Sequence, residues 1–266
     1  MFTTFYSMNK QPFQKEISVE NLFKFSSYNE GLARLEYLKN TRGIGTIVGD
    51  PGSGKTTLVR KFTSTLNPSL FKVMYIPLST VTVSDFYRSL AYNLGETPKF
   101  RKIELFTQIQ QAIINLYKNQ KVIPVIILDE IHMASNSFLN DIALLFNFHM
   151  DSENPFILIL VGLSHFLDKI KLHHMQPLNQ RIIIRHKVNH LSKEEVRDYI
   201  EHQINYAGSN YQIFTVDSIE AIYLRTNGQI RVINNLALHC LIYGHANKLQ
   251  YINSEAVYEA SQALGL

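Results

Sequence analysis

The chain has 266 residues, 45% of them apolar, which suits one large and one small domain, and it holds no run of the ~18 apolar residues that a membrane span requires. Since the N-terminus lacks the basic-then-apolar order of a secretory signal and the single cysteine excludes an internal disulfide, we expect a cytoplasmic protein. The net charge of +4 divides into +7 over residues 1–191 and −3 over residues 192–266, which favours two units with different partners and a polyanion as a partner of the first.

Strand-like and helix-like segments alternate over the first 188 residues. Apolar runs bounded by turn residues predict buried strands at 43–49, 71–78, 122–130, 155–162 and 181–188. Between them, apolar residues spaced by three and four predict helices at 55–66, 82–95, 104–119, 138–150 and 165–174. Buried strands that alternate with helices form a parallel sheet covered on both faces, so we predict an α/β domain with a five-stranded parallel sheet.

The pattern changes after Asn189. Two of the segments that follow begin with Ser or Thr and carry an acidic residue about three positions later, which is typical of a helical capping box. The predicted domains are therefore an α/β domain over 1–190, N-terminal extension included, and a small all-helical lid over 191–266, with helices at 192–208, 215–228, 231–248 and 253–265.

A glycine-rich loop joins the first predicted strand to its helix. Residues 49–56, GDPGSGKT, match G-x-x-x-x-G-K-[ST], in which backbone N–H groups and the N-terminus of the following helix surround phosphates. Lys55 would reach the β- and γ-phosphates, and the Thr56 hydroxyl would ligate Mg²⁺. The predicted nucleotide contacts are Gly49, Asp50, Pro51, Gly52, Ser53, Gly54, Lys55, Thr56 and Thr57.

Two carboxylates follow the most apolar strand. Asp129 and Glu130 come directly after Ile126-Ile127-Leu128, at the strand end where open α/β sheets bind ligands. We expect Asp129 to hold Mg²⁺ and Glu130 to orient or polarise the water that attacks ATP. His132 makes the segment D-E-I-H, as in DExH helicases, but the residues after 190 cannot supply the second α/β domain that a helicase needs.

These segments together carry a family resemblance over roughly residues 1–262. The opening FYSMNKQPF, the loop GDPGSGKTTL, VIILDE, FILILVGLSHF with QPLNQRI, and NGQIRVINNLALHCLIYG occur in the order found in ExeA-like AAA+ ATPases, which are close to the helper ATPases of DNA transposons. The chain therefore resembles a P-loop NTPase of the AAA+ type.

The resemblance implies roles for further residues. Arg231 matches the sensor 2 arginine that reaches from the lid to the γ-phosphate, and Ser164 stands within one or two positions of sensor 1. Arg181 is the candidate arginine finger that acts on the ATP of a neighbouring subunit, with Arg185 as the alternative. A finger supplied by another chain implies ATP-dependent self-association, as a ring or a helical filament.

The N-terminal aromatic residues have two open roles. Phe5, Tyr6 and Phe13 would pack near the adenine or brace the sheet, and we favour bracing.

The process that such an ATPase serves has two candidate answers. The first is a transposition helper that assembles on duplex DNA and recruits or activates a transposase, with Lys99, Arg101 and Lys102 as a phosphate-tracking cluster or, alternatively, an ordinary solvated loop. The second is an ExeA-like ATPase of a secretion or envelope-assembly system. A nucleotide-binding module without hydrolysis would conflict with the joint presence of Glu130, Arg181 and Arg231.

Overall fold

The computed structural model describes residues 1–14, 17–78, 82–149 and 152–266, which form two compact units. Residues 30–51 and 55–188 make the sheet unit, and residues 1–29, 52–54 and 189–266 make the helical unit. Within the described residues, no helix has the length and apolarity to cross a membrane.

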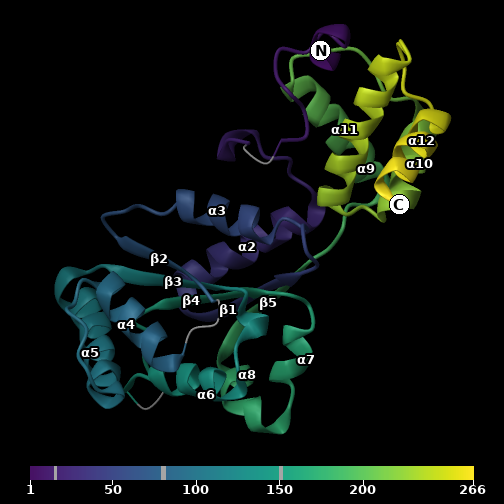
Figure 1. Cartoon of the computed structure of the whole chain (residues 1–266). Helices are drawn as coiled ribbons and strands as arrows, with labels where there is room; N and C mark the ends of the chain where they lie inside the picture. Colours follow the sequence, from purple (N-terminus) through teal and green to yellow (C-terminus); the bar gives the residue numbers. More distant parts are fainter. Residues whose placement is uncertain (15–16, 79–81, 150–151) are drawn as a thin grey trace. The chain divides into compact units, whose positions relative to one another are not determined.

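A parallel sheet of five strands forms the centre of the sheet unit (Figure 1). Its strand order is β2-β3-β4-β1-β5, with every pair parallel. The sequence-based prediction of a five-stranded parallel sheet is therefore confirmed. The strands are β1 (Gly43–Gly49), β2 (Phe71–Pro77), β3 (Ile123–Asp129), β4 (Ile157–Gly162) and β5 (Ile182–Val188).

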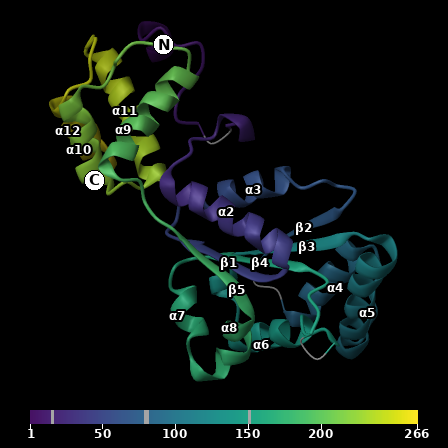
Figure 2. The ribbon, with the colours of Figure 1, turned by 180° about the vertical axis from the view of Figure 1, so that it is seen from behind.

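Helices cover both faces of this sheet, and Figures 1 and 2 show the layers from opposite sides. On one face lie α2 (Ser26–Thr41) and α3 (Lys55–Ser64). The other face carries α4 (Val83–Leu94), α5 (Lys102–Asn115), α6 (Asn136–Leu145), α7 (Phe166–Ile170) and α8 (Gln176–Arg181), with the single turns η2 (Leu116–Gln120), η3 (Ile131–Met133) and η5 (His173–Met175).

The central strands are buried on both faces, whereas the edge strands are not. In β3, Ile126 and Leu128 belong to the core under α4 to α8, and Val125 and Ile127 are buried on the opposite face. Exposed and buried residues alternate along β5, and Val73 and Tyr75 of β2 are 41% and 50% exposed. The expectation of five fully buried strands is wrong for β2 and β5, because these strands lie at the edges of the sheet and one face of each is left exposed.

Two helices that flank the sheet, α2 and α8, were not predicted from the sequence. The segment of α2 has no clean apolar stripe, and α8 is a short helix that begins with Gln176-Pro177. The helix expected at 165–174 is divided into α7 and η5. The helix expected at 138–150 ends at Leu145, and its last expected residue, Met150, lies outside the described residues.

Four helices make up most of the helical unit: α9 (Lys193–Tyr206), α10 (Val216–Thr226), α11 (Ile230–Ala246) and α12 (Ser254–Leu264). The predicted capping box at the start of α9 is present, since the Ser192 side chain accepts from the Glu195 N–H and Glu195 accepts from the Ser192 N–H. All four helices that the sequence predicts after residue 191 are present, so this prediction is confirmed.

The N-terminal extension, with α1 (Phe2–Phe5) and η1 (Val19–Asn21), packs in the helical unit. Tyr6 is 4% exposed and its hydroxyl donates to the Leu249 carbonyl at 3.0 Å; Phe13 is 6% exposed and its N–H donates to Gln203 Oε1. Phe5 is 40% exposed and its ring meets His245 edge-on. These aromatics therefore brace the helical unit and not the sheet, and the extension groups with the lid rather than with the α/β domain.

Candidate functional site: the phosphate loop and the acidic pair

The glycine-rich loop leaves β1 and enters α3, as its motif requires. Gly52 and Gly54 have φ angles of 78° and 97°, a region that residues with a side chain rarely adopt. Both glycines are therefore needed for the backbone path. Ser53 between them is 2% exposed, and its hydroxyl has no hydrogen-bond partner among the described residues.

The side chain of Lys55 folds back onto the start of the glycine-rich loop. Its ammonium donates to the carbonyls of Gly49 and Asp50, each at 2.9 Å. The lysine therefore holds its positive charge over the loop to which the motif assigns the phosphates. Thr56, the next residue, is exposed in the first turn of α3.

The acidic pair lies at the same edge of the sheet as the loop. Asp129 ends β3, and β4 separates β3 from β1, whose end carries the loop. Since all strands are parallel, their carboxyl ends share one edge, where ligands of open α/β sheets bind. Asp129 is 7% exposed, with Oδ2 accepting from the Tyr75 hydroxyl at 2.7 Å and Oδ1 accepting from the Glu130 N–H at 2.9 Å.

Glu130 projects from a strained backbone. Its φ of 59° is in the left-handed region, an uncommon conformation for a residue with a side chain, and such strain clusters at functional sites. The carboxylate is about half exposed and lies 3.4 Å from His132 Nδ1. Burial lowers the pKa of His132, although the Glu130 charge opposes that shift. Glu130 thus presents a solvent-accessible carboxylate directly after β3, and its action on water stays a prediction.

Ser164 is two residues beyond the end of β4, between the loop strand and the acidic strand. Its hydroxyl donates to Asp50 Oδ1 at 3.4 Å. The structure therefore brings this residue into contact with the phosphate loop, and its sensor role stays a prediction.

The candidate finger residues make bonds inside their own chain. Arg181, at the end of α8, donates to the Ala143 carbonyl. Arg185 in β5 donates to the carbonyl and to the side-chain oxygen of Asn179. Action of either arginine on a neighbouring subunit remains a prediction.

Arg231 is the second residue of α11 and is exposed. The turn before α11 packs against the backbone of Leu191, whose N–H donates to the Gly228 carbonyl at 3.0 Å. Gly228 has a φ of 73°, and a Cβ there would lie 2.0 Å from the Leu191 oxygen. This glycine therefore sets where α11 begins, and with it the position of Arg231 in the helical unit.

The three cations of the predicted basic cluster are not equally available to bind a phosphate. Lys99 and Arg101 are exposed in the α4–α5 connection, and neither side chain forms an ion pair with a residue that the structure describes. Lys102 is paired with Asp141 at 2.8 Å. Phe100, between the two exposed cations, is 86% exposed.

Two site features were missed in the sequence. Tyr75 bonds Asp129 from the neighbouring strand β2, and the His165 ring meets His132 edge-on at 5.2 Å between centroids. Tyr75 is the only hydroxyl-bearing residue of β2, which is a signal for such a contact once β2 is placed beside β3.

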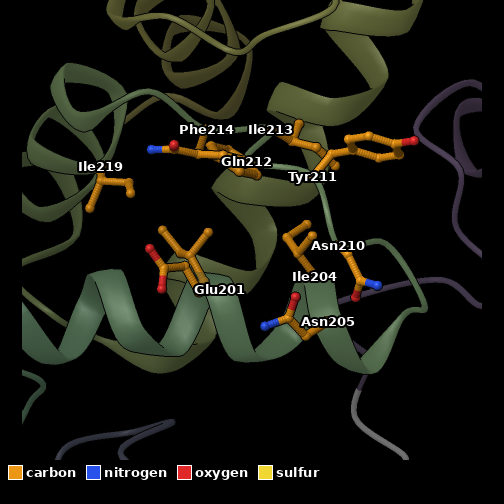
Figure 3. A pocket seen from close by; sticks show the side chains of 10 residues that line it. Glu201, Ile204, Asn205, Asn210, Tyr211, Gln212, Ile213, Phe214 and Ile219 are labelled. Carbon is orange, nitrogen blue, oxygen red and sulfur yellow. The ribbon is translucent and has the colours of Figure 1, made fainter.

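A hollow of about 280 Å³ lies wholly within the helical unit (Figure 3). Its floor is apolar, with Ile204, Ile213 and Phe214 each below 5% exposed, and Glu201, Asn205 and Tyr211 stand at its rim. Because so little apolar surface is open, this hollow offers a ligand little hydrophobic contact.

The residues of the loop and the acidic pair fit a magnesium nucleotide. Asp129 supplies a buried, oriented carboxylate and Thr56 an exposed hydroxyl, which are the oxygen ligands that Mg²⁺ prefers. Ser53 adds a buried hydroxyl that lacks a partner among the described residues, inside a loop suited to phosphate. Within the described residues, no cluster of three or more His, Cys, Asp or Glu side chains suggests another metal site.

The parallel sheet, the glycine-rich loop after β1 and the acidic pair after β3 define a P-loop NTPase of the AAA+ class. The chain belongs to the AAA domain family, whose model matches residues 38–170.

Known proteins resemble the chain over most of its length. It is 26% identical over 269 residues to General secretion pathway protein A of Aeromonas hydrophila, a match that covers 98% of this chain and 49% of the relative. The chain thus spans about half the length of this curated relative. The predicted resemblance to ExeA-like AAA+ ATPases is confirmed at this level, and the relation to transposition helpers stays a prediction.

Two solved structures show the same fold. Cdc6p from Pyrobaculum aerophilum superposes with a TM-score of 0.69 at 16% identity, covering 94% of this chain and 70% of that one. A Drosophila ORC structure bound to DNA gives a TM-score of 0.72 at 12% identity, covering 100% of this chain and 66% of that one.

Proposed function

We propose that this chain is a Mg-ATP-hydrolysing switch. The observation that carries the proposal is the placement of Asp129 and Glu130 at the carboxyl edge of the sheet. Only β4 lies between their strand and β1, the strand that leads into the glycine-rich loop. A protein that only bound nucleotide would need no more than the glycine-rich loop. Hydrolysis needs in addition a metal ligand and a group that orients water, and the two carboxylates provide both.

Each residue has a defined task in this reaction. The loop amides and Lys55 bind the phosphates, and Thr56 and Asp129 hold Mg²⁺, which would neutralise charge on the β- and γ-phosphates. Glu130 accepts a hydrogen bond from the attacking water and aligns it with the γ-phosphorus. Ser164, whose hydroxyl donates to Asp50, would serve as sensor 1 and help to place the same water.

We further propose that the site is completed by a second copy of the chain. Arg181 would supply the positive charge that stabilises the transition state, and Arg231 would contact the γ-phosphate from the helical unit. Assembly then depends on ATP, and hydrolysis times disassembly. The partner geometry is a ring or a helical filament.

The favoured partner is duplex DNA, and the favoured process is the activation of a transposase. Support comes from the net charge of +7 over residues 1–191, from the exposed cations Lys99 and Arg101, and from the fold shared with an ORC structure that is bound to DNA. Contacts from such cations go to phosphates and give affinity without reading sequence.

A second candidate is a role in secretion or envelope assembly. It is favoured by the 26% identity to General secretion pathway protein A, which extends over 98% of this chain. In that case ATP-driven assembly would serve a protein partner at an envelope, and binding to DNA would be weak.

Electron microscopy distinguishes the two processes. We expect the chain, mixed with a non-hydrolysable ATP analogue, to form filaments or rings on duplex DNA, and to release phosphate from ATP in the presence of Mg²⁺. Assembly that never occurs on DNA would favour the secretion role. No phosphate release under any assembly condition would contradict the ATPase itself.

Charge reversal locates the DNA contact. Replacing Lys99 and Arg101 by Glu should weaken DNA binding and make its salt dependence shallower, since each lost phosphate contact removes about one unit from the slope of log K against log salt. The matched control is Lys121→Glu, an exposed cation after η2. Unchanged binding of the double variant at low salt would rule out this cluster.

A further inference from the structure

The side chain of Tyr75 reaches the predicted magnesium ligand from the neighbouring strand. Tyr75 pairs with Ile127 in the β2–β3 register, and Asp129 lies two residues further along β3. Side chains two residues apart on paired strands share a face of the sheet. A tyrosine ring that leans along its strand can therefore reach this carboxylate, and the Tyr75 hydroxyl donates to Asp129 Oδ2 at 2.7 Å.

The shared face is the one that α3 covers. Ile127 is buried on the side opposite the core under α4 to α8, and α3 lies on that side (Figure 1). Because Thr56 is in the first turn of α3, the hydroxyl and the carboxylate assigned to Mg²⁺ belong to the same side of the sheet.

Both oxygens of Asp129 are already oriented by a donor. Tyr75 bonds Oδ2, and the backbone N–H of Glu130 bonds Oδ1 at 2.9 Å. A carboxylate offers about four lone-pair sites, so two remain for a metal ion or its water. With Asp129 only 7% exposed, these two donors decide in which direction the remaining lone pairs point.

The tyrosine is suited to this task. The ordinary pKa of a tyrosine hydroxyl is about 10, so at neutral pH the Tyr75 hydroxyl is protonated and can donate to Asp129. The ring is 50% exposed at the sheet edge and is not part of the core. Removing the hydroxyl alone should therefore leave the fold intact.

We propose that Tyr75 is a positioning residue for the magnesium ion of the bound nucleotide, acting through its hydrogen bond to Asp129. The inference rests on the proposed function, since it concerns the metal of that same site. Partners that orient a metal-ligating carboxylate typically contribute 10- to 100-fold to metal affinity.

The test compares Tyr75→Phe with the wild-type chain in the binding of Mn²⁺, followed by electron paramagnetic resonance in the presence of ADP. We expect Mn²⁺ affinity to fall about 10- to 100-fold in the variant. ADP affinity measured in EDTA should stay within about twofold of the wild-type value. Tyr92→Phe, at a tyrosine that is 75% exposed on α4, is the matched control.

A double-mutant cycle separates positioning from a structural role. If Tyr75 acts through the carboxylate, Tyr75→Phe should change Mn²⁺ affinity in the wild-type background and have almost no effect in the Asp129→Ala background. In phosphate-release assays, the Mg²⁺ concentration for half-maximal rate should rise, while the rate at saturating Mg²⁺ returns towards wild type.

The contradicting results distinguish the role of Tyr75 from the proposed ATPase. Mn²⁺ affinity of Tyr75→Phe equal to that of the wild type, or an equal loss in both backgrounds, would refute the role of Tyr75 and leave the proposed ATPase standing. A wild-type chain that binds Mn²⁺ and ADP but never releases phosphate from ATP would refute the ATPase and leave the role of Tyr75 standing. Wild-type protein without metal-dependent nucleotide binding would refute both.

Discussion

At the scale of single residues, the site depends on backbone conformations that most side chains avoid. Gly52 and Gly54 use positive φ angles in the phosphate loop, and Glu130 adopts a left-handed conformation despite its side chain. The glycines make the loop path accessible, and Glu130 follows the end of β3 in its left-handed conformation with its carboxylate about half exposed. The backbone conformation, as well as the side-chain chemistry, therefore limits which residues can replace these three.

Gly54→Ala tests the loop. Its φ of 97° should cost a side-chain-bearing residue about 1–2 kcal/mol, so the loop will relax away from the phosphate-binding path. We expect ATP affinity, measured by isothermal titration calorimetry, to fall about tenfold.

The matched control for Gly54→Ala is Gly265→Ala. Gly265 also has a positive φ, 70°, but has no neighbour within 4 Å and ends α12. Unchanged ATP affinity in Gly54→Ala would show that the loop does not need this conformation to bind nucleotide.

At the scale of elements, the N-terminal extension is a structural part of the helical unit. The Tyr6 hydroxyl lies so close to Gly244 in α11 that a Cβ there would be 2.3 Å from it. Glu195, near the start of α9, also accepts from the Ser26 N–H at 2.8 Å, at the start of α2. The N-terminal residues therefore contact both α9 and α11.

Gly244→Ala tests the packing of the extension. In an unhindered helix this change would stabilise by up to about 1 kcal/mol, but here the added methyl group meets Tyr6 and Ile252. We expect a loss of about 1–3 kcal/mol in urea unfolding. In a Tyr6→Phe background the loss should be smaller, and stabilisation by Gly244→Ala alone would contradict the contact.

A histidine in the same unit makes its stability depend on pH. Burial lowers the pKa of His202, whose ring packs 5.6 Å from that of Phe23 between centroids. The unfolded chain therefore takes up a proton on this histidine at a higher pH than the folded chain does. The contribution of neutral His202 to the free energy of unfolding is complete above a pH of about 6.5, and it falls as the solution is acidified.

His202→Phe should flatten that dependence. Between pH 7.5 and 5.5 the unfolding midpoint should drop less in the variant than in the wild type, whereas His239→Phe, at an exposed histidine of α11, should behave as the wild type. An identical drop in all three proteins would assign the pH dependence to other groups.

Particular elements show what the sequence could predict. The five strands and the four lid helices were predictable, because period and turn residues report local structure. The strand order and the Tyr75–Asp129 contact were not, since strand neighbours are decided by tertiary packing. The placement of the aromatic extension was also missed, because Tyr6 and Phe13 are apolar enough for either core.

At the scale of the whole molecule, each proposed active site depends on two chains. Arg181 of one subunit would act at the nucleotide whose water is aligned by Glu130 of the next. Arginine fingers contribute ~10³-fold or more to related reactions. Arg181→Ala should therefore bind ATP normally and hydrolyse it at a small fraction of the wild-type rate.

Mixing two inactive variants tests this dependence. In a mixture of Arg181→Ala with Glu130→Gln, some interfaces combine an intact Glu130 with an intact Arg181, so phosphate release should exceed the sum of the separate rates. Arg185→Ala in place of Arg181→Ala identifies the finger if the alternative holds. If mixed assemblies are visible by electron microscopy but phosphate release does not recover in either mixture, neither Arg181 nor Arg185 is an arginine finger.

The most direct measurement separates nucleotide binding from hydrolysis at Glu130. For Glu130→Gln we expect ATP affinity within about threefold of the wild type, since the loop is intact. The rate of phosphate release at saturating Mg-ATP should fall at least ~100-fold, because a neutral amide orients and polarises the attacking water far less well than a carboxylate does. Hydrolysis at the wild-type rate by Glu130→Gln would contradict the assignment of the acidic pair as a hydrolytic centre.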